Sequence, residues 1–164
     1  MFGRTCSRLI IEMCVTNGCF FCHNEEMDPQ CQQLISDNHG WVTSTIGFPH
    51  RRPCVHANLL DILPDQTFDS TWSFIQKLHA INDANFRSEL PCLTCGQSCD
   101  LFDREDPDID VSGLPCWDNS PSGKKRYEEG ATNAIFICHA KLHVEKGTKI
   151  VIVETSLVSI TVII

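Results

Sequence analysis

The sequence predicts an α/β fold, and three consecutive segments in its last third support that prediction. Residues 108–111 (Asp-Ile-Asp-Val) alternate between polar and apolar side chains and run into Gly113, which is typical of a short strand ending in a turn. Residues 132–146 place apolar side chains on stripes with helical spacing. Residues 150–153 (Ile-Val-Ile-Val) are apolar and β-branched, as expected for a strand buried on both faces of a parallel sheet. Strand, helix and strand in this order form a βαβ unit.

The ends of two helices can be predicted from capping residues. Thr132 or Asn133 is a suitable N-cap for the helix of the βαβ unit, and Gly147 occupies the C′ position just after its last turn. A second helix is expected from an N-cap at Asp69 to about Ile81, because residues 71, 74, 75 and 78 share one helical face. Residues 82–107 are predicted to form a loop.

Composition divides the chain into two regions. Residues 1–58 are rich in Cys, His and Gly and have no sustained period, so we expect an irregular Cys-rich N-terminal region. Residues 59–164 contain every predicted helix and strand and are expected to form the α/β domain.

Charge and hydropathy limit the classes of partner. The net charge of −8 argues against strong unaided binding to nucleic acid, which usually requires a basic surface. The mean hydropathy is −0.11 and no run of 18 apolar residues exists, so no membrane span is expected. A secretory signal is not evident, so an intracellular location is expected, with the eleven cysteines reduced and acting as metal ligands, reactive groups or buried side chains.

Three cysteines have a spacing typical of metal ligands. They form the pattern Cys92-x-x-Cys95-x-x-x-Cys99, and thiolates at this spacing bind one tetrahedral zinc ion when a fourth ligand is found. Cys19, Cys22, His23 and Cys31 are further candidates for that ligand. The alternative is a set of reduced, partly buried thiols without a metal.

His139 and His143 stand one helical turn apart, a spacing that suits a metal pair. The residue after His139 is not glutamate, so the metalloprotease pattern is absent. We therefore expect both histidines on the exposed face of their helix.

Two reactive side chains follow the two strands of the predicted βαβ unit. Cys116 lies shortly after the first strand and Glu154 directly after the apolar run of the second. Because the carboxyl ends of parallel strands meet at one edge of the sheet, the two residues are expected to lie near one another. Cys116 is then either a nucleophile or one more structural thiol.

The residues around Cys116 resemble the cytosine C5 DNA methyltransferase family. The family's nucleophile motif has an acidic residue opening a strand, then Gly-x-Pro-Cys, a serine and Gly-Lys, and its second motif has a glutamate at the next strand end. This sequence has the matching residues Asp108, Gly113, Pro115, Cys116, Ser120, Gly123, Lys124 and Glu154. The match covers about residues 108–155.

The resemblance implies a partial Rossmann-like S-adenosylmethionine-dependent methyltransferase fold that acts on cytosine in DNA or RNA, in the nucleus if the substrate is DNA. Cys116 would attack the flipped base and Glu154 would activate it. By the same resemblance, Pro115, Ser120 and Gly123 shape the substrate loop and Lys124 meets a phosphate.

Some residues depart from the family pattern. Trp117 stands where the family has glutamine, Thr155 stands where it has asparagine, and no Phe-x-Gly-x-Gly cofactor loop precedes Cys116, so no residues are assigned to S-adenosylmethionine. The chain ends ten residues after Glu154, which predicts a truncated or divergent member. The alternative function is a non-catalytic methyltransferase fragment or a zinc-stabilised module that binds nucleic acid or protein.

Overall fold

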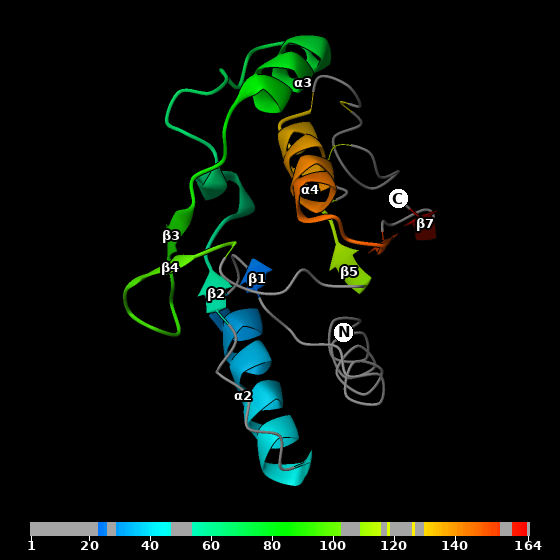
Figure 1. Cartoon of the computed structure of the whole chain (residues 1–164). Helices are drawn as coiled ribbons and strands as arrows, with labels where there is room; N and C mark the ends of the chain where they lie inside the picture. The colour runs from blue at the N-terminus through cyan, green and yellow to red at the C-terminus, as the bar shows by residue number, and fades with distance from the viewer. Residues whose placement is uncertain are drawn as a thin grey trace. The chain divides into compact units, whose positions relative to one another are not determined.

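The computed structural model describes residues 23–25, 29–46, 54–102, 109–115, 118, 126, 130–154 and 159–163, and these contain both helices and strands in small sheets (Figure 1). The α/β class predicted from the sequence is therefore confirmed. The chain divides into two compact units, one made of Met1–Asn58 with Glu89–Pro107 and the other of Leu59–Ser88 with Asp108–Ile164. The segment Glu89–Pro107 thus belongs with the N-terminal region.

The first unit contains two small sheets and one long helix. Strand β1 (His23–Glu25) pairs in parallel with β2 (Cys54–His56), and helix α2 (Pro29–Ile46) lies between them in the sequence. Strand β3 (Glu89–Pro91) pairs antiparallel with β4 (Ser98–Asp100).

Two contacts join β2 to the β3–β4 hairpin. The Leu93 N–H donates to the Val55 carbonyl at 2.8 Å, and the His56 Nδ1 atom hydrogen-bonds the Pro91 carbonyl at 2.9 Å. Several apolar side chains near these contacts are buried and form the core of this unit: Cys54, Val55, Leu90, Cys92 and Leu101.

Two predictions for this part of the chain are wrong. The N-terminal region is not irregular throughout, because Pro29–Ile46 form an 18-residue helix. Its sequence contains Gly40 and several β-branched residues, so no clear apolar stripe indicates the helix. Residues 82–107 are not all loop, because β3 and β4 lie there; each has three residues, too few to show an alternating pattern.

The second unit contains the predicted βαβ arrangement. Strand β5 (Ile109–Gly113) pairs in parallel with β6 (Ile150–Glu154), and helix α4 (Asn133–Lys146) connects them. Strand β7 (Ser159–Ile163) adds antiparallel to the other side of β6, giving the order β5-β6-β7.

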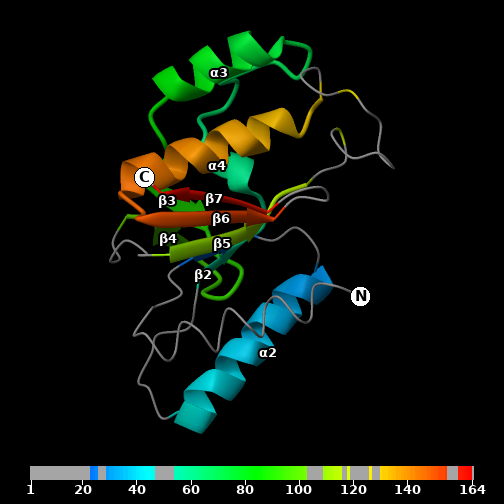
Figure 2. The same ribbon diagram turned by 90° about the vertical axis from the view of Figure 1, so that its right-hand side faces the viewer.

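Helices cover this sheet in two successive layers. Figure 2 shows α4 between the sheet and helix α3 (Phe74–Asp83), and the 3₁₀ helix η1 (Leu59–Ile62) also packs against α4. The buried apolar side chains of the unit come from these elements and the adjoining turns: Leu59, Ile62, Leu63, Ile81, Ala134, Ile137, Cys138, Leu142 and Val151. Among the β6 side chains that the structure describes, Val151 is buried and Ile150, Ile152 and Val153 are half-buried, so the expected burial of that strand on both faces is wrong.

The helix ends follow the capping rules with one shift. Helix α4 ends as predicted, with Gly147 in the left-handed conformation at φ 62° and its N–H donating to the carbonyls of His143 and Val144. Helix α3 begins later than predicted, because Ser73 rather than Asp69 is the N-cap and forms a capping box with Gln76.

Lys141 attaches α4 to the end of α3. Its Nζ atom donates to the carbonyls of Ile81 and Asn82, both at 2.9 Å, and to that of Ala84. The last carbonyls of a helix have no partner within the helix, and Lys141 of α4 supplies hydrogen bonds to them. Its positive charge also interacts favourably with the negative end of the α3 dipole.

The two histidines of α4 are not on its exposed face as expected. His139 is 7% exposed and His143 is 5% exposed. The expected solvated face is wrong because Asp110 and Ser112 on β5 lie in direct contact with these histidines, between the sheet and α4. None of the described helices is long and apolar enough to cross a membrane.

The packing of α3 can be tested with two isoleucines of the same helix. Ile81 is fully buried and Ile75 is 57% exposed. We expect Ile81→Ala to lower the free energy of unfolding by about 2–5 kcal/mol, because it leaves a cavity. Ile75→Ala should change it by less than about 0.5 kcal/mol, as measured by urea denaturation. Equal effects of the two variants would contradict this packing.

Candidate functional site

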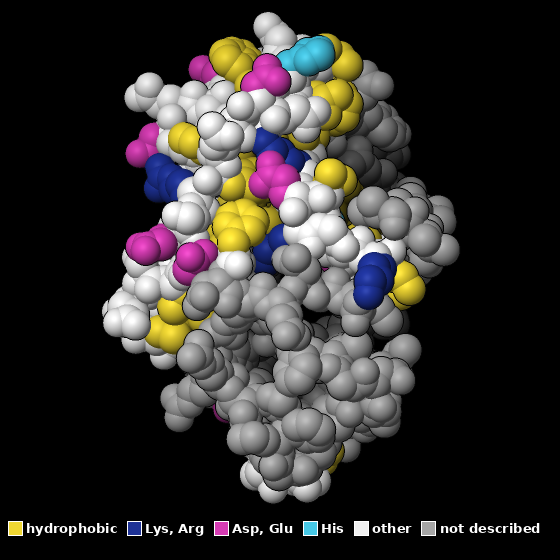
Figure 3. Space-filling model, viewed as in Figure 1, with side chains coloured by type: hydrophobic (Ala, Val, Ile, Leu, Met, Phe, Trp, Pro, Cys, Tyr) yellow, Lys and Arg dark blue, Asp and Glu magenta, His cyan; other side chains and the backbone are white. Residues whose placement is uncertain are grey.

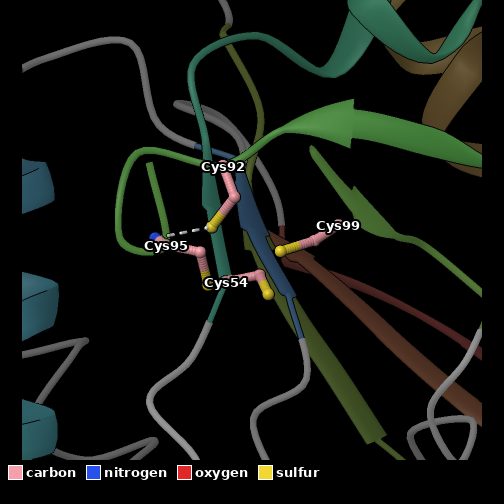
Figure 4. A group of neighbouring side chains, drawn as sticks. All are labelled: Cys54, Cys92, Cys95 and Cys99. Atoms are coloured by element: carbon pink, nitrogen blue, oxygen red, sulfur yellow. Dashed lines mark hydrogen bonds between the residues drawn. The ribbon is translucent and has the colours of Figure 1, made fainter. Parts of the chain in front are cut away.

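Four cysteines of the first unit form a compact group, which we call the cysteine cluster: Cys54, Cys92, Cys95 and Cys99. Their sulfur atoms all lie within 4.8 Å of one another. Figure 4 shows the four side chains turned toward a common centre. None of these four cysteines forms a disulfide bond.

The turn between β3 and β4 places three of these cysteines. Cys92 follows β3, and its N–H and carbonyl bond Gln97 and Gly96, both at 2.9 Å, which closes a tight turn around Cys95. Gly96 adopts φ 69°, a conformation that favours glycine. Cys99 then lies on β4.

Strand β2 supplies the fourth sulfur, from Cys54. The bond between Leu93 and the carbonyl of Val55, the residue after Cys54, holds β2 against the turn. Cys54 lies 38 positions before Cys92, so no local spacing indicates it as a ligand. The predicted trio therefore has a fourth partner that the sequence did not reveal. The side chains of Cys19, Cys22, His23 and Cys31 lie outside the described residues.

The protonation of the cluster suits a cation site. Burial would raise the pKa of Cys92, but hydrogen bonds from backbone N–H groups, including that of Cys95 at 3.4 Å, lower the pKa to about 7. The pKa of Cys95 is raised to about 11 because its thiol is hydrogen-bonded to the sulfurs of Cys99 and Cys92. Burial raises the pKa of Cys99 to about 11. The sulfurs of the cluster therefore share protons among themselves. A metal ion that bound to them would displace these protons.

The donor set fits zinc. Four thiolates in a closed tetrahedral arrangement form a structural site, with Zn–S distances of about 2.3 Å. The cluster can therefore hold a metal ion, and zinc matches its four sulfur donors.

The edge formed by β5 and β6 is the second feature of interest. The two strands pair in register, so that Gly113 at the end of β5 lies opposite Glu154 at the end of β6. Pro115 follows β5 and is exposed. The predicted nucleophile Cys116 and its loop residues Ser120, Gly123 and Lys124 lie outside the described residues, as does the side chain of Glu154.

One residue of the loop after Cys116 is fixed by the helix. Asp118 is buried, and its Oδ2 atom accepts hydrogen bonds from the N–H of Thr132 at 2.9 Å and from the Thr132 hydroxyl at 2.8 Å. Thr132 is the N-cap of α4, where a negative charge is favourable. The sequence did not indicate Asp118, because it lies 14 residues before Thr132 and no local pattern links the two.

Gly130 allows this contact. A Cβ atom at residue 130 would lie 2.4 Å from the Cβ of Asp118, closer than real Cβ contacts allow. Glycine is therefore required where the chain passes the buried carboxylate.

Comparisons with known proteins returned no relatives. The chain matches no protein-family model, no curated protein and no solved structure.

The cysteine cluster predicts thiolate coordination that can be followed by spectroscopy. Anaerobic addition of Co²⁺, which replaces zinc in tetrahedral sites, should give sulfur-to-metal charge-transfer absorption. The double variant Cys92→Ser/Cys95→Ser should lose this absorption. Cys138→Ala, which removes a buried thiol of the other unit, should retain it. Charge-transfer bands that survive in the double variant would place the cobalt on other sulfurs.

The contact between Gly130 and Asp118 predicts a loss of stability when a side chain is added at residue 130. Gly130→Ala should lower the free energy of unfolding by about 1–3 kcal/mol, because the added methyl group displaces Asp118. Gly40→Ala is the matched control, since nothing lies within 4 Å of its added Cβ and alanine favours a helix by up to about 1 kcal/mol. Denaturant unfolding of both variants measures the difference. A neutral Gly130→Ala would show that the approach of Asp118 is looser than described.

Proposed function

We propose that the chain is a cytosine C5 methyltransferase-type protein in which Cys116 is the nucleophile and Glu154 its partner. One observation supports this above the others: the parallel register that sets Gly113 opposite Glu154. The Pro115-Cys116 segment follows the end of β5 in the sequence, and Glu154 is the last residue of β6. In this proposal β5, β6 and α4 belong to a partial Rossmann-like methyltransferase fold.

The chemistry explains why a cysteine and a glutamate are needed together. The Cys116 thiolate forms a bond to C6 of cytosine while the C5–C6 π electrons shift into the ring toward N3. A carboxyl proton from Glu154 at N3 neutralises the charge that develops there. C5 becomes an enamine carbon that can take up an electrophile, and loss of the C5 proton followed by expulsion of the thiolate restores the ring. The base must first leave its stack, so the substrate is a flipped cytosine of DNA or RNA.

Asp118 supports the proposal as the described residue nearest in sequence to the nucleophile. It lies two residues after Cys116 and is bonded to the N-cap of α4, the helix that links the two strands.

No group of described residues is identified that would hold S-adenosylmethionine. The Phe-x-Gly-x-Gly loop that binds it in the family does not precede Cys116 in the sequence. We therefore assign no residue to the methyl donor and no step to it.

Nucleic acid remains the proposed partner, through the loop rather than through a broad basic surface. On the face drawn in Figure 3, acidic and basic side chains of the described residues are interspersed, and neither sign forms a continuous patch. Together with the net charge of −8, this favours contacts confined to the target base and its nearest phosphates, with Lys124 as a proposed phosphate contact.

The cysteine cluster favours a second candidate function, a zinc-stabilised binding module without catalysis. A closed four-sulfur site adds stability and offers no open coordination position for chemistry. In that case the first unit would be the functional part, and Cys116 would be a structural thiol.

Covalent trapping separates the two candidates. An oligonucleotide containing 2-pyrimidinone in place of the target cytosine accepts a thiol at C6 without any methyl transfer, and intact-mass spectrometry detects the adduct. We expect an adduct that Cys116→Ser abolishes and Glu154→Gln slows by at least about a hundredfold, the usual contribution of general acid catalysis. The controls Cys138→Ala and Glu145→Gln should form it normally.

A second arm with 5-fluorocytosine and S-adenosylmethionine reports methyl transfer, because the fluorinated adduct persists only after the methyl group has been added. An adduct with 2-pyrimidinone alone would keep Cys116 as a nucleophile and remove the methyl donor from the proposal. The absence of any Cys116-dependent adduct in both arms would overturn the proposed function and favour the binding module.

A further inference from the structure

A second cluster of metal-binding groups lies inside the second unit, between β5 and α4. It consists of Asp110 on β5 and of His139 and His143 on α4. The Oδ1 atom of Asp110 lies 3.4 Å from the Nε2 atoms of both histidines, and the two Nε2 atoms are 3.1 Å apart. Three donor atoms from two elements thus converge on one point.

The separations match those around a tetrahedral zinc ion. Ligands at about 2.0–2.1 Å from the metal, arranged tetrahedrally, are roughly 3.3 Å from each other. The three observed separations of 3.1, 3.4 and 3.4 Å fall close to this value. No other element has to move to bring the three atoms within reach of one ion.

A hydrogen bond to the ring nitrogen that does not face the metal orients His143. The Nδ1 atom of His143 bonds the Thr148 hydroxyl at 2.9 Å, and Thr148 follows the C-cap of α4. A donor bond from Nδ1–H to this oxygen leaves the Nε2 lone pair free for a metal, as in most histidine metal sites. The Ser112 hydroxyl, two residues after Asp110 on the same face of β5, instead bonds two of the proposed ligand atoms themselves, Asp110 Oδ1 and His139 Nε2, so an ion that binds there takes over these bonds.

The charges of the cluster favour a cation. Burial raises the pKa of Asp110, but the bonds from His139 and Ser112 and the nearby His143 hold it below its ordinary value, so the carboxylate is ionised. Burial, with smaller contributions from nearby His139 and Lys146, lowers the pKa of His143 to about 4 against the opposing pull of Asp110. His143 is therefore a neutral imidazole at neutral pH, which is the form that binds metals.

We propose that Asp110, His139 and His143 form a binding site for a divalent transition-metal ion, best matched by zinc. The ion takes the place of the proton at His139 Nε2, which is carried on Nδ1 of the same ring in the metal-binding tautomer, and is held by two imidazoles and one carboxylate, with a fourth position left for water. The metal links β5 directly to α4, whose N-cap holds Asp118. This site is distinct from the cysteine cluster and does not depend on the proposed function.

Nitrogen NMR of the histidine rings tests the site without relying on activity. The full chain is titrated with Zn²⁺ after removal of all metal, and the ring Nε2 and Nδ1 signals are followed. We expect the Nε2 signals of His139 and His143 to move to metal-bound positions while exposed His79 stays unchanged. Zinc bound at the cysteine cluster leaves all three histidines unchanged, so the two sites are read separately.

Variants identify the ligands. Asp110→Asn and His139→Gln should each weaken zinc binding at this site by more than about tenfold, and Thr148→Val, which removes the orienting bond to His143, by about tenfold or more. The matched controls His79→Gln and Asp83→Asn, both on the exposed surface of α3, should bind as the unaltered chain does.

Two outcomes would overturn the proposal. If the signals of His139 and His143 in the folded, unaltered chain stay at their metal-free positions with zinc in excess, the cluster is a hydrogen-bonded network of Ser112, Asp110 and the two histidines. Binding that is unaffected by Asp110→Asn would also contradict it, because the carboxylate would then not be a ligand.

Discussion

The parallel pairing of β5 with β6 is the constraint on which the second unit depends. Its register sets Gly113 opposite Glu154, and it also sets Asp110 opposite Val151. A shift by one residue would turn Asp110 and Ser112 away from α4 and replace Glu154 by Val153 at the strand end. The proposed catalytic edge and the proposed metal site therefore rest on the same backbone pairing, and both would be lost together.

Metal binding at the two clusters would explain how such small sheets are stable. Strands of three residues in the first unit and a three-stranded sheet in the second offer little apolar surface to each other. In each unit, metal-ligating side chains from separate elements meet at one point: the cysteine cluster joins β2 to the β3–β4 hairpin, and the Asp110 cluster joins β5 to α4. A bound ion would contribute stability that the apolar core of each unit does not supply alone.

The features predictable from the sequence are those that depend on neighbouring residues. The alternation before Gly113, the β-branched run 150–153 and Gly147 after Lys146 each fix a local conformation, and the βαβ unit follows from their order. Cys54 could not be predicted, because it joins the Cys92 turn through contacts of two distant segments. The burial of His139 and His143 depends on Asp110 and Ser112 of β5, which contact them from the sheet beneath α4. No pattern within α4 itself indicates it.

The register of β5 and β6 can be measured directly by NMR in the uniformly labelled chain. Parallel pairing of Gly113 with Glu154 predicts cross-strand contacts between the backbone protons of Ser112 and Val153 and between those of Gly113 and Glu154, together with contacts between Asp110 and Val151. The same contacts shifted by one residue, or their absence in the folded protein, would contradict the account.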